Sequence, residues 1–91
     1  MSVHWTKLAQ DDAESIFHYI AVDSLRKAMA HEERIMAAVE RLARHQRLGR
    51  PGTRPGTREL VVPRTSYLVI YREENGGVEI LRIFHGARDW P

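Results

Sequence analysis

Apolar and polar residues alternate along the last third of the chain, with the period of two that is typical of β-strands. The alternation covers residues 58–63, 66–72 and 78–85. Asn75 and Gly76 lie between the last two runs. Asn-Gly at the central positions of a turn favours a tight β-hairpin, because both positions need a positive φ. The pattern therefore predicts an antiparallel meander of three strands.

The register of the final hairpin follows if Asn75 and Gly76 form its loop, because paired residues point to the same face. The predicted pairs are Glu73 with Val78, Arg72 with Glu79, Tyr71 with Ile80, Val69 with Arg82, Tyr67 with Phe84, and Ser66 with His85. One face of this hairpin is aliphatic, and we expect helices to cover it. It carries Leu68, Ile70, Leu81 and Ile83.

The opposite face of the hairpin mixes aromatic side chains with arginine. It carries Tyr67, Val69, Tyr71, Ile80, Arg82 and Phe84. This composition is typical of a protein interface, so we expect a partner to bind there. A core with both faces covered, or an exposed face without a role, is the alternative.

A short alternating stretch, Val3–Trp5, predicts an edge strand, and a first helix follows it. Asp11 and Glu14 have the spacing of a capping box, and their charges suit the positive end of a helix dipole. We therefore expect this helix to begin at Asp11 and to end near Val22. Its apolar stripe consists of Ala13, Ile16, Phe17 and Ile20.

A second helix is predicted over residues 24–44, with Asp23 or Ser24 as its N-cap. Its apolar stripe is interrupted only by Glu32, and Glu40 and Arg44 have the spacing of an i,i+4 ion pair. The two methionines of the stripe, Met29 and Met36, are most simply core residues, although methionine also suits an adaptable interface.

The order of strand, helix, helix and three strands predicts an α+β fold. In it, an antiparallel helix hairpin packs on one face of an antiparallel sheet that ends in the three-stranded meander. The chain has 91 residues, which suits one domain covering residues 1–91.

The composition narrows the chemistry. The chain has no cysteine, and its five histidines show no HxH or HExxH spacing, so we expect no metal site. Its glycine-rich segment lacks the ending of a phosphate-binding loop, and we expect neither a cofactor nor a small-molecule ligand. No apolar run approaches the ~20 residues that span a membrane, and the start does not match a signal peptide. We expect a cytoplasmic protein without a membrane partner.

Arginine is concentrated between the second helix and the meander. The positions are Arg41, Arg44, Arg47, Arg50, Arg54, Arg58 and Arg64, with Glu59 as the only acidic residue among them. Guanidinium groups bind carboxylates and phosphates, so this basic run suits an acidic protein segment or a nucleic acid. A GC-rich genome accounts equally well for any single arginine.

Metal-free RNA cleavage is the catalytic chemistry that these residue types could support. It needs a general base, an acid, and cations for the developing phosphorane charge. The candidates in this chain are Arg58, Arg64, Arg82 and His85. Structural roles are the alternative, because Arg72 and Glu79 form a predicted cross-strand ion pair and His85 could simply end a strand.

The order of elements resembles that of the RelE/ParE superfamily of toxins from type II toxin–antitoxin modules. The resemblance extends over nearly the whole chain, and it includes Arg58-Glu59-Leu60 at the start of the meander. It is strongest in Tyr67-Leu68-Val69-Ile70-Tyr71-Arg72, Val78-Glu79-Ile80-Leu81-Arg82-Ile83 and His85-Gly86-Ala87-Arg88-Asp89-Trp90.

The resemblance implies a growth-inhibiting bacterial toxin that a cognate antitoxin neutralises. The antitoxin's flexible, often acidic segment typically lies along the helix hairpin and across the sheet. The residues expected to bind the antitoxin or the target are Tyr67, Val69, Tyr71, Arg82, Phe84, Arg88 and Trp90.

The superfamily has two main kinds of target. RelE-type members cut mRNA on the ribosome, and they usually carry an arginine directly after the tyrosine of the middle meander strand, with a reactive C-terminal tyrosine or histidine. Here Leu68 follows Tyr67, and the last residue is Pro91. ParE-type members inhibit DNA gyrase and tolerate an aliphatic residue at this position. The ParE type is therefore favoured, with a ribosome-dependent mRNA endonuclease as the alternative. A toxin with another target, and a basic binding domain without toxicity, also remain open.

Overall fold

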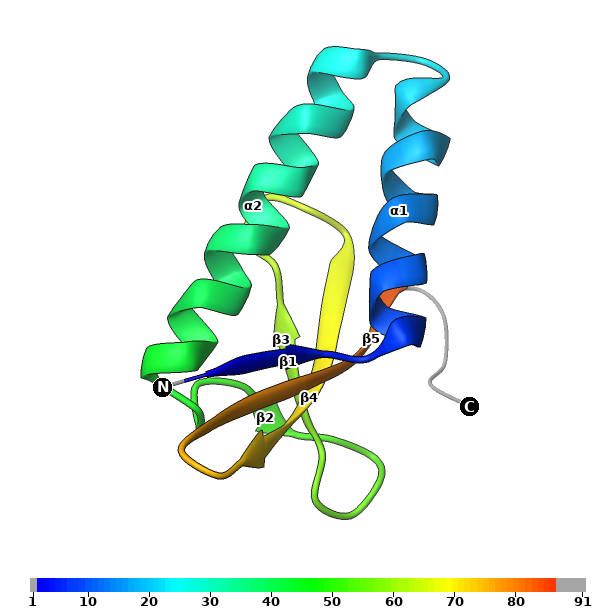
Figure 1. The fold of residues 1–91 in the computed structure, drawn as a ribbon. Coiled ribbons are helices and arrows are strands. Elements are labelled where there is room, and N and C mark those ends of the chain that lie inside the picture. Colours follow the sequence, from blue (N-terminus) through cyan, green and yellow to red (C-terminus); the bar gives the residue numbers. More distant parts are fainter. Residues whose placement is uncertain (1, 87–91) are drawn as a thin grey trace.

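The structure, a computed structural model, describes residues 2–86. The elements follow in the order β1 (Val3–Trp5), α1 (Lys7–Ala21), α2 (Leu25–Arg44), β2 (Arg50–Pro51), β3 (Arg58–Val61), β4 (Tyr67–Glu74) and β5 (Gly77–His85). The strands form one sheet in the order β1-β5-β4-β3-β2. The α+β fold and the edge position of β1 are confirmed, and the two helices cover one face of the sheet (Figure 1).

The sheet is mixed, because β1 runs parallel to β5 while the other pairs are antiparallel. The meander of β3, β4 and β5 is confirmed, and the short β2 extends it by one strand. The parallel pair arises because the chain leaves β1 directly into α1 and returns to the neighbouring position only with its last strand.

The predicted start of α1 is wrong by about one turn. The helix begins at Lys7, and Thr6 is its N-cap, with its hydroxyl accepting a hydrogen bond from the Ala9 amide. The same hydroxyl lies 2.9 Å from the carbonyl oxygen of Ile80, so the cap also fastens the helix to β5. Asp11, the predicted cap, lies within the helix and pairs with Lys7.

The helix α2 matches its prediction closely. Ser24 is the N-cap, and Glu40 and Arg44 form the predicted ion pair at 3.4 Å. The core assignment of its methionines is wrong, because Met29 is 52% exposed and Met36 is 48% exposed. The buried face of α2 instead uses Ala28, Ile35, Ala38, Val39 and Leu42.

The hairpin of β4 and β5 has the predicted register only near its loop. Glu73 faces Val78 and Tyr71 faces Ile80, as predicted, but Ile70 then faces Arg82. Leu81 is therefore an extra residue in β5, which makes a β-bulge. Beyond it every pair is shifted by one, so that Val69 faces Ile83, Leu68 faces Phe84 and Tyr67 faces His85.

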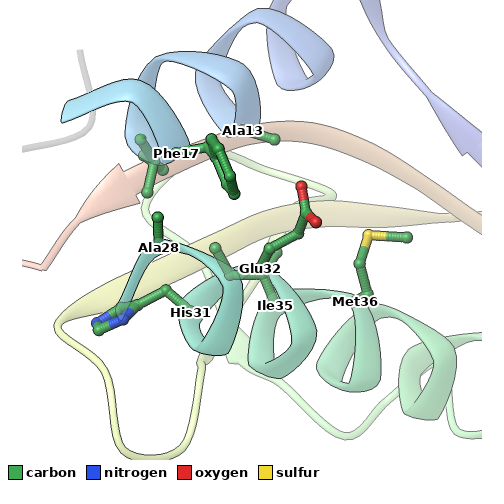
Figure 2. A pocket seen from close by; sticks show the side chains of 8 residues that line it. Ala13, Phe17, Ala28, His31, Glu32, Ile35 and Met36 are labelled. Carbon is green, nitrogen blue, oxygen red and sulfur yellow. The ribbon is translucent and has the colours of Figure 1, made fainter. Parts of the chain in front are cut away.

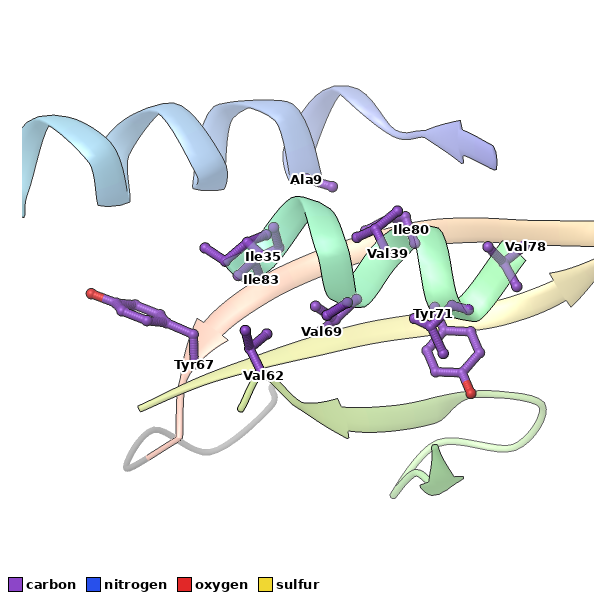
Figure 3. Close-up of a cluster of buried hydrophobic side chains, with 12 residues drawn as sticks. Ala9, Ile35, Val39, Val62, Tyr67, Val69, Tyr71, Val78, Ile80 and Ile83 are labelled. Carbon is purple, nitrogen blue, oxygen red and sulfur yellow. The ribbon is translucent and has the colours of Figure 1, made fainter. Parts of the chain in front are cut away.

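The prediction of which face meets the helices is wrong for most of the hairpin. The core under the helices contains Tyr67, Val69, Tyr71, Val78, Ile80 and Ile83 (Figure 3). Leu68 and Ile70 alternate with these residues along β4 and so point to the other face. Ile83 meets the helices as predicted, because the bulge returns it to the core side.

The hydroxyl of Tyr71 explains how a tyrosine can lie at the centre of this core. It donates a hydrogen bond to the carbonyl oxygen of Gln46 and accepts one from the amide of Gly49, both at 2.8 Å. A Cβ at Gly49 would lie 2.8 Å from the Tyr71 ring, so only glycine allows this approach. Burial raises the pKa of Tyr71.

Candidate functional site

The face of the sheet opposite the helices carries an apolar strip with one arginine. Its cross-strand pairs are Val61 with Leu68, Leu68 with Phe84, and Ile70 with Arg82. The guanidinium carbon of Arg82 lies 4.5 Å from the centre of the Phe84 ring. Arg82 and Phe84 thus lie on this face as predicted, but their neighbours are aliphatic residues rather than tyrosines.

Arg82 is held by Asp12 of α1. Its Nε lies 2.8 Å from one carboxylate oxygen, and its Nη2 lies 3.0 Å from the other. Asp12 also accepts a hydrogen bond from the Ile83 amide at 2.9 Å. Both side chains are largely shielded, with exposures of 24% for Arg82 and 17% for Asp12. The hydrogen bond to Asp12 raises the pKa of Arg82.

The structure does not bring the four nuclease candidates together. Arg58 faces Tyr71 across β3 and β4, and so lies on the helix side. It donates to the carbonyl oxygen of Gly49 at 2.8 Å and lies 3.9 Å from Glu73. Arg82, on the opposite face, is bound to Asp12.

Arg64 and His85 lie at one end of the sheet. Arg64 is in the turn between β3 and β4, with a φ of 63°, and its carbonyl oxygen accepts a hydrogen bond from Arg34. His85 pairs with Tyr67 at the end of β5. These two candidates are near the same turn, whereas Arg58 is at the far end of β3.

A row of three rings at this end of the sheet was not expected from the sequence. Tyr67 makes edge-on contacts with His31 of α2 and with His85, with ring centres 6.2 Å and 5.5 Å apart. The Nδ1 of His31 lies 2.9 Å from the carbonyl oxygen of Lys27. The three rings come from three different elements, so no local spacing could have revealed them.

The predicted basic run is partly neutralised by glutamates. Arg44 pairs with Glu40, Arg50 with Glu59, and Arg47 with Glu73. The glutamates come from three different elements, which explains why the run appears more basic in the sequence than it is in the fold. Its surface is therefore a mixed-charge surface rather than a uniform cationic track.

One group of potential metal ligands lies at the edge of the sheet within residues 2–86. Single atoms of His4, Glu74 and Glu79 lie within 4.8 Å of one another. Glu79 is also bound to Arg72 at 2.6 Å, which is the predicted cross-strand pair. His4 Nδ1 lies 3.1 Å from Glu79. Glu79 already contacts both Arg72 and His4, so interactions among these side chains explain why the group is clustered.

The helices α1 and α2 and the turn between them carry most of the large exposed apolar side chains of the described region. They are Leu8, Tyr19, Val22, Leu25, Met29 and Met36. Within α2, Leu25, Met29 and Met36 form a second stripe beside the buried one, and this spacing could have been recognised in the sequence. No helix within residues 2–86 has the length and apolar character to span a membrane.

Of the predicted binding residues, Tyr67, Val69 and Tyr71 belong to the buried core. Their burial leaves Val69 and Tyr71 without exposed surface for a partner. Phe84 and Arg82 are half-buried on the open face. Arg88 and Trp90 lie outside the described residues.

Comparison with known proteins identifies relatives over nearly the whole chain. Residues 3–90 match the family described as "ParE toxin of type II toxin-antitoxin system, parDE". A Sinorhizobium fredii protein named "Putative toxin Y4kP" is 37% identical over 89 residues, covering 98% of this chain and 92% of its own length.

A solved structure has the same architecture. It is described as "Chromosomal ParDE TA system from P. aeruginosa", and it superposes with a TM-score of 0.81 at 32% identity. The match covers 93% of this chain and 95% of the other. With this fold and these relatives, the chain belongs to the ParE toxin family of type II toxin–antitoxin systems.

Proposed function

We propose that this ParE-family toxin stops bacterial growth by binding and inhibiting DNA gyrase, and that a cognate antitoxin neutralises it in the cytoplasm. The family and both relatives support the toxin assignment. The antitoxin is proposed because the matched Pseudomonas structure is described as a ParDE system. Gyrase is proposed as the target because the chain lacks the arginine expected of an mRNA-cutting relative.

The observation that carries this choice of target is the pairing of Arg82 with Asp12. A guanidinium that stabilises a phosphorane must direct its N–H groups at the phosphate. Here the Nε and Nη2 of Arg82 are directed at one carboxylate. Leu68 lies across from Phe84, so the position that carries arginine in RelE-type relatives adds no charge to this face.

The remaining nuclease candidates do not compensate for this pairing. Arg58 lies on the helix side of the sheet, and Arg64 lies in the turn at the opposite end of β3. His85 lines the same pocket as Arg82, but the guanidinium there is bound to Asp12. Catalysis needs its acid, base and cations around one reacting phosphate. This arrangement therefore favours a toxin that acts by binding.

The helix hairpin is the proposed seat of the antitoxin. Its exposed Leu25, Met29 and Met36 present an apolar stripe, and such a stripe fits the apolar face of a partner helix. Val22 and Tyr19 extend the apolar surface to the turn between the helices. Association would remove this surface from water, which is the main driving force of such interfaces.

Induction of the toxin in cells, with and without the antitoxin encoded by the neighbouring reading frame, tests this proposal. We expect growth arrest without the antitoxin, plasmids that lose negative supercoils, and recovery when the antitoxin is supplied. Primer extension on translated mRNA should show no cleavage at the ribosomal A site. Normal growth, or A-site cuts with unchanged plasmid topology, would contradict the proposal.

A further inference from the structure

A groove between α1 and α2 combines apolar walls with two carboxylates. We call it the hairpin groove. Its lining comes from β1, α1 and α2, and consists of Trp5, Gln10, Ala13, Glu14, Phe17, Glu32 and Met36. A cavity of ≈ 50 Å³ between the helices adjoins it and shares Ala13, Phe17, Glu32 and Met36 with it. Figure 2 shows Phe17, Glu32 and Met36 around this cavity.

The charge of the hairpin groove differs from that of the chain as a whole. The chain carries a net charge of +2, yet neither lysine nor arginine lines the groove or the cavity. Glu32 has no ion-pair partner among residues 2–86. Glu14 lies 3.8 Å from His18 on the solvent side of α1. Within the described part of the chain, the lining of the groove therefore has two carboxylates and no lysine or arginine, and the nearby Lys7, which feels the charge of Glu14, is hydrogen-bonded to Asp11.

A purely apolar occupant would suit this groove poorly. It would cover Phe17 and Met36, but it would also displace water from Glu14 and Glu32 without replacing the lost hydrogen bonds. A lysine or arginine avoids this cost, because its aliphatic stem can lie on apolar side chains while its charged end reaches the carboxylates. Arginine can in addition stack on an aromatic ring such as Trp5.

We infer that the hairpin groove binds an arginine or lysine from the antitoxin, with the stem of that residue between Phe17 and Met36 and its charge at Glu14 and Glu32. This inference rests on the proposed pairing with an antitoxin. Because the toxin is basic overall, an acidic antitoxin segment would be expected from its net charge alone. The inference adds one basic residue to that segment. Such a local charge match would fix the position of the antitoxin along the hairpin more than it would raise affinity.

The test measures the affinity of the purified full-length toxin for the purified antitoxin of the neighbouring reading frame, by titration calorimetry. We expect Glu32→Gln to weaken binding, and the double variant E14Q/E32Q to weaken it at least ~10-fold, because a charged partner then loses both carboxylates. Glu33→Gln on the same helix is the matched control, because it removes an exposed charge outside the groove. We expect its affinity to stay within ~2-fold of wild type.

A charge exchange makes the test specific for a basic anchor. Glu32→Lys should bind the wild-type antitoxin poorly, and one Lys→Glu or Arg→Glu change in the antitoxin should restore that binding. Glu14 and Glu32 are both exposed, so the variants should fold, and circular dichroism checks this.

Several results would overturn the inference. If E14Q/E32Q binds the antitoxin with wild-type affinity, the groove does not bind a basic residue of the antitoxin, although the toxin–antitoxin pairing itself still holds. If E14Q/E32Q keeps its antitoxin affinity but no longer inhibits gyrase, the groove binds the target. If it keeps that affinity but loses a self-associated form seen for the wild type in size-exclusion chromatography, the groove binds a second copy of the chain. Failure of the wild-type chain to bind the antitoxin at all would refute the pairing proposed above, and the anchor with it.

Discussion

Asp12 joins α1 to the last strand through three hydrogen bonds. Two go to Arg82 and one to the amide of Ile83. Only residues 78–80 of β5 pair with β1. Asp12 accepts a hydrogen bond from a backbone amide further along β5, where no strand of residues 2–86 lies beside that edge. A single side chain thereby satisfies a backbone donor and the half-buried guanidinium of Arg82.

Replacing Asp12 should therefore destabilise the fold. We expect Asp12→Ala to lower the free energy of unfolding by about 2 kcal/mol, because it leaves a shielded guanidinium and an amide unpaired. Urea unfolding followed by circular dichroism measures this. Asp11→Asn, which affects an exposed pair with Lys7, is the control and should leave the transition midpoint unchanged. Equal midpoints for both variants would contradict a structural role of Asp12.

Tyr71 offers a prediction on pH. Burial raises its pKa above the ordinary value of about 10, so the unfolded chain ionises this group at a lower pH than the folded one. Its contribution to stability is complete below pH ~10 and is lost as the pH rises toward the folded pKa. Tyr71→Phe removes the hydrogen bonds to Gln46 and Gly49, and we expect it to cost about 2 kcal/mol at pH ~7.

The measurement compares unfolding free energies of wild type and Tyr71→Phe across the alkaline range. The advantage of the wild type should shrink above pH ~10. The difference between the two proteins isolates Tyr71 from the other tyrosines, which both proteins share. A constant difference up to pH ~11 would show that the hydroxyl does not titrate as its burial requires.

At the scale of elements, the β4–β5 hairpin shows how far the sequence predicts the fold. The Asn-Gly loop correctly fixed the pairs next to it, because turn geometry acts locally. The bulge at Leu81 then reversed the faces expected for the rest. The neighbouring apolar residues Ile80 and Leu81 break the alternation and could have indicated the slip, but two adjacent apolar residues also suit a strand covered on both faces.

The assignment of faces failed for a related reason. Composition favoured the aliphatic face as the buried one, but Tyr71 is buried because Gln46 and Gly49 satisfy its hydroxyl. Those partners lie more than twenty residues away in sequence, so no local pattern could reveal them. The pairing of Asp12 with Arg82, 70 residues apart, escaped prediction in the same way. The ion pairs within α2 and across the hairpin were predicted because fixed spacings determine them.

The attachment of β1 to the hairpin provides a prediction at this scale. A Cβ at Gly77 would lie 2.0 Å from the carbonyl oxygen of Ser2. That oxygen accepts a hydrogen bond from the amide of Val78. Gly77→Ala should displace β1 and cost about 2 kcal/mol of unfolding free energy. It should also speed hydrogen exchange of the Val78 amide.

Gly76→Ala is the matched comparison for this variant. Gly76 has a φ of 80° and nothing within 4 Å of an added Cβ, so alanine there costs only backbone strain, about 1 kcal/mol. In the Gly76→Ala variant, the Val78 amide should remain protected from hydrogen exchange. Equal protection of Val78 in both variants would show that β1 tolerates the added methyl group.

At the scale of the whole molecule, the helix hairpin and the open sheet face have different chemical characters. The hairpin is apolar with an acidic groove, and the sheet face is an apolar strip next to a neutralised arginine. A toxin needs surfaces for two proteins, the antitoxin and the target. Under the proposed function, the two surfaces would allow the antitoxin and the target to be recognised on different parts of a small chain.

Supercoiling of relaxed plasmid by purified DNA gyrase, in the presence of the purified toxin, tests the central claim most directly. We predict that supercoiling declines as toxin is added, that cleaved gyrase–DNA complexes accumulate, and that prior mixing with the antitoxin prevents both effects. Full gyrase activity at micromolar concentrations of folded toxin would contradict the account.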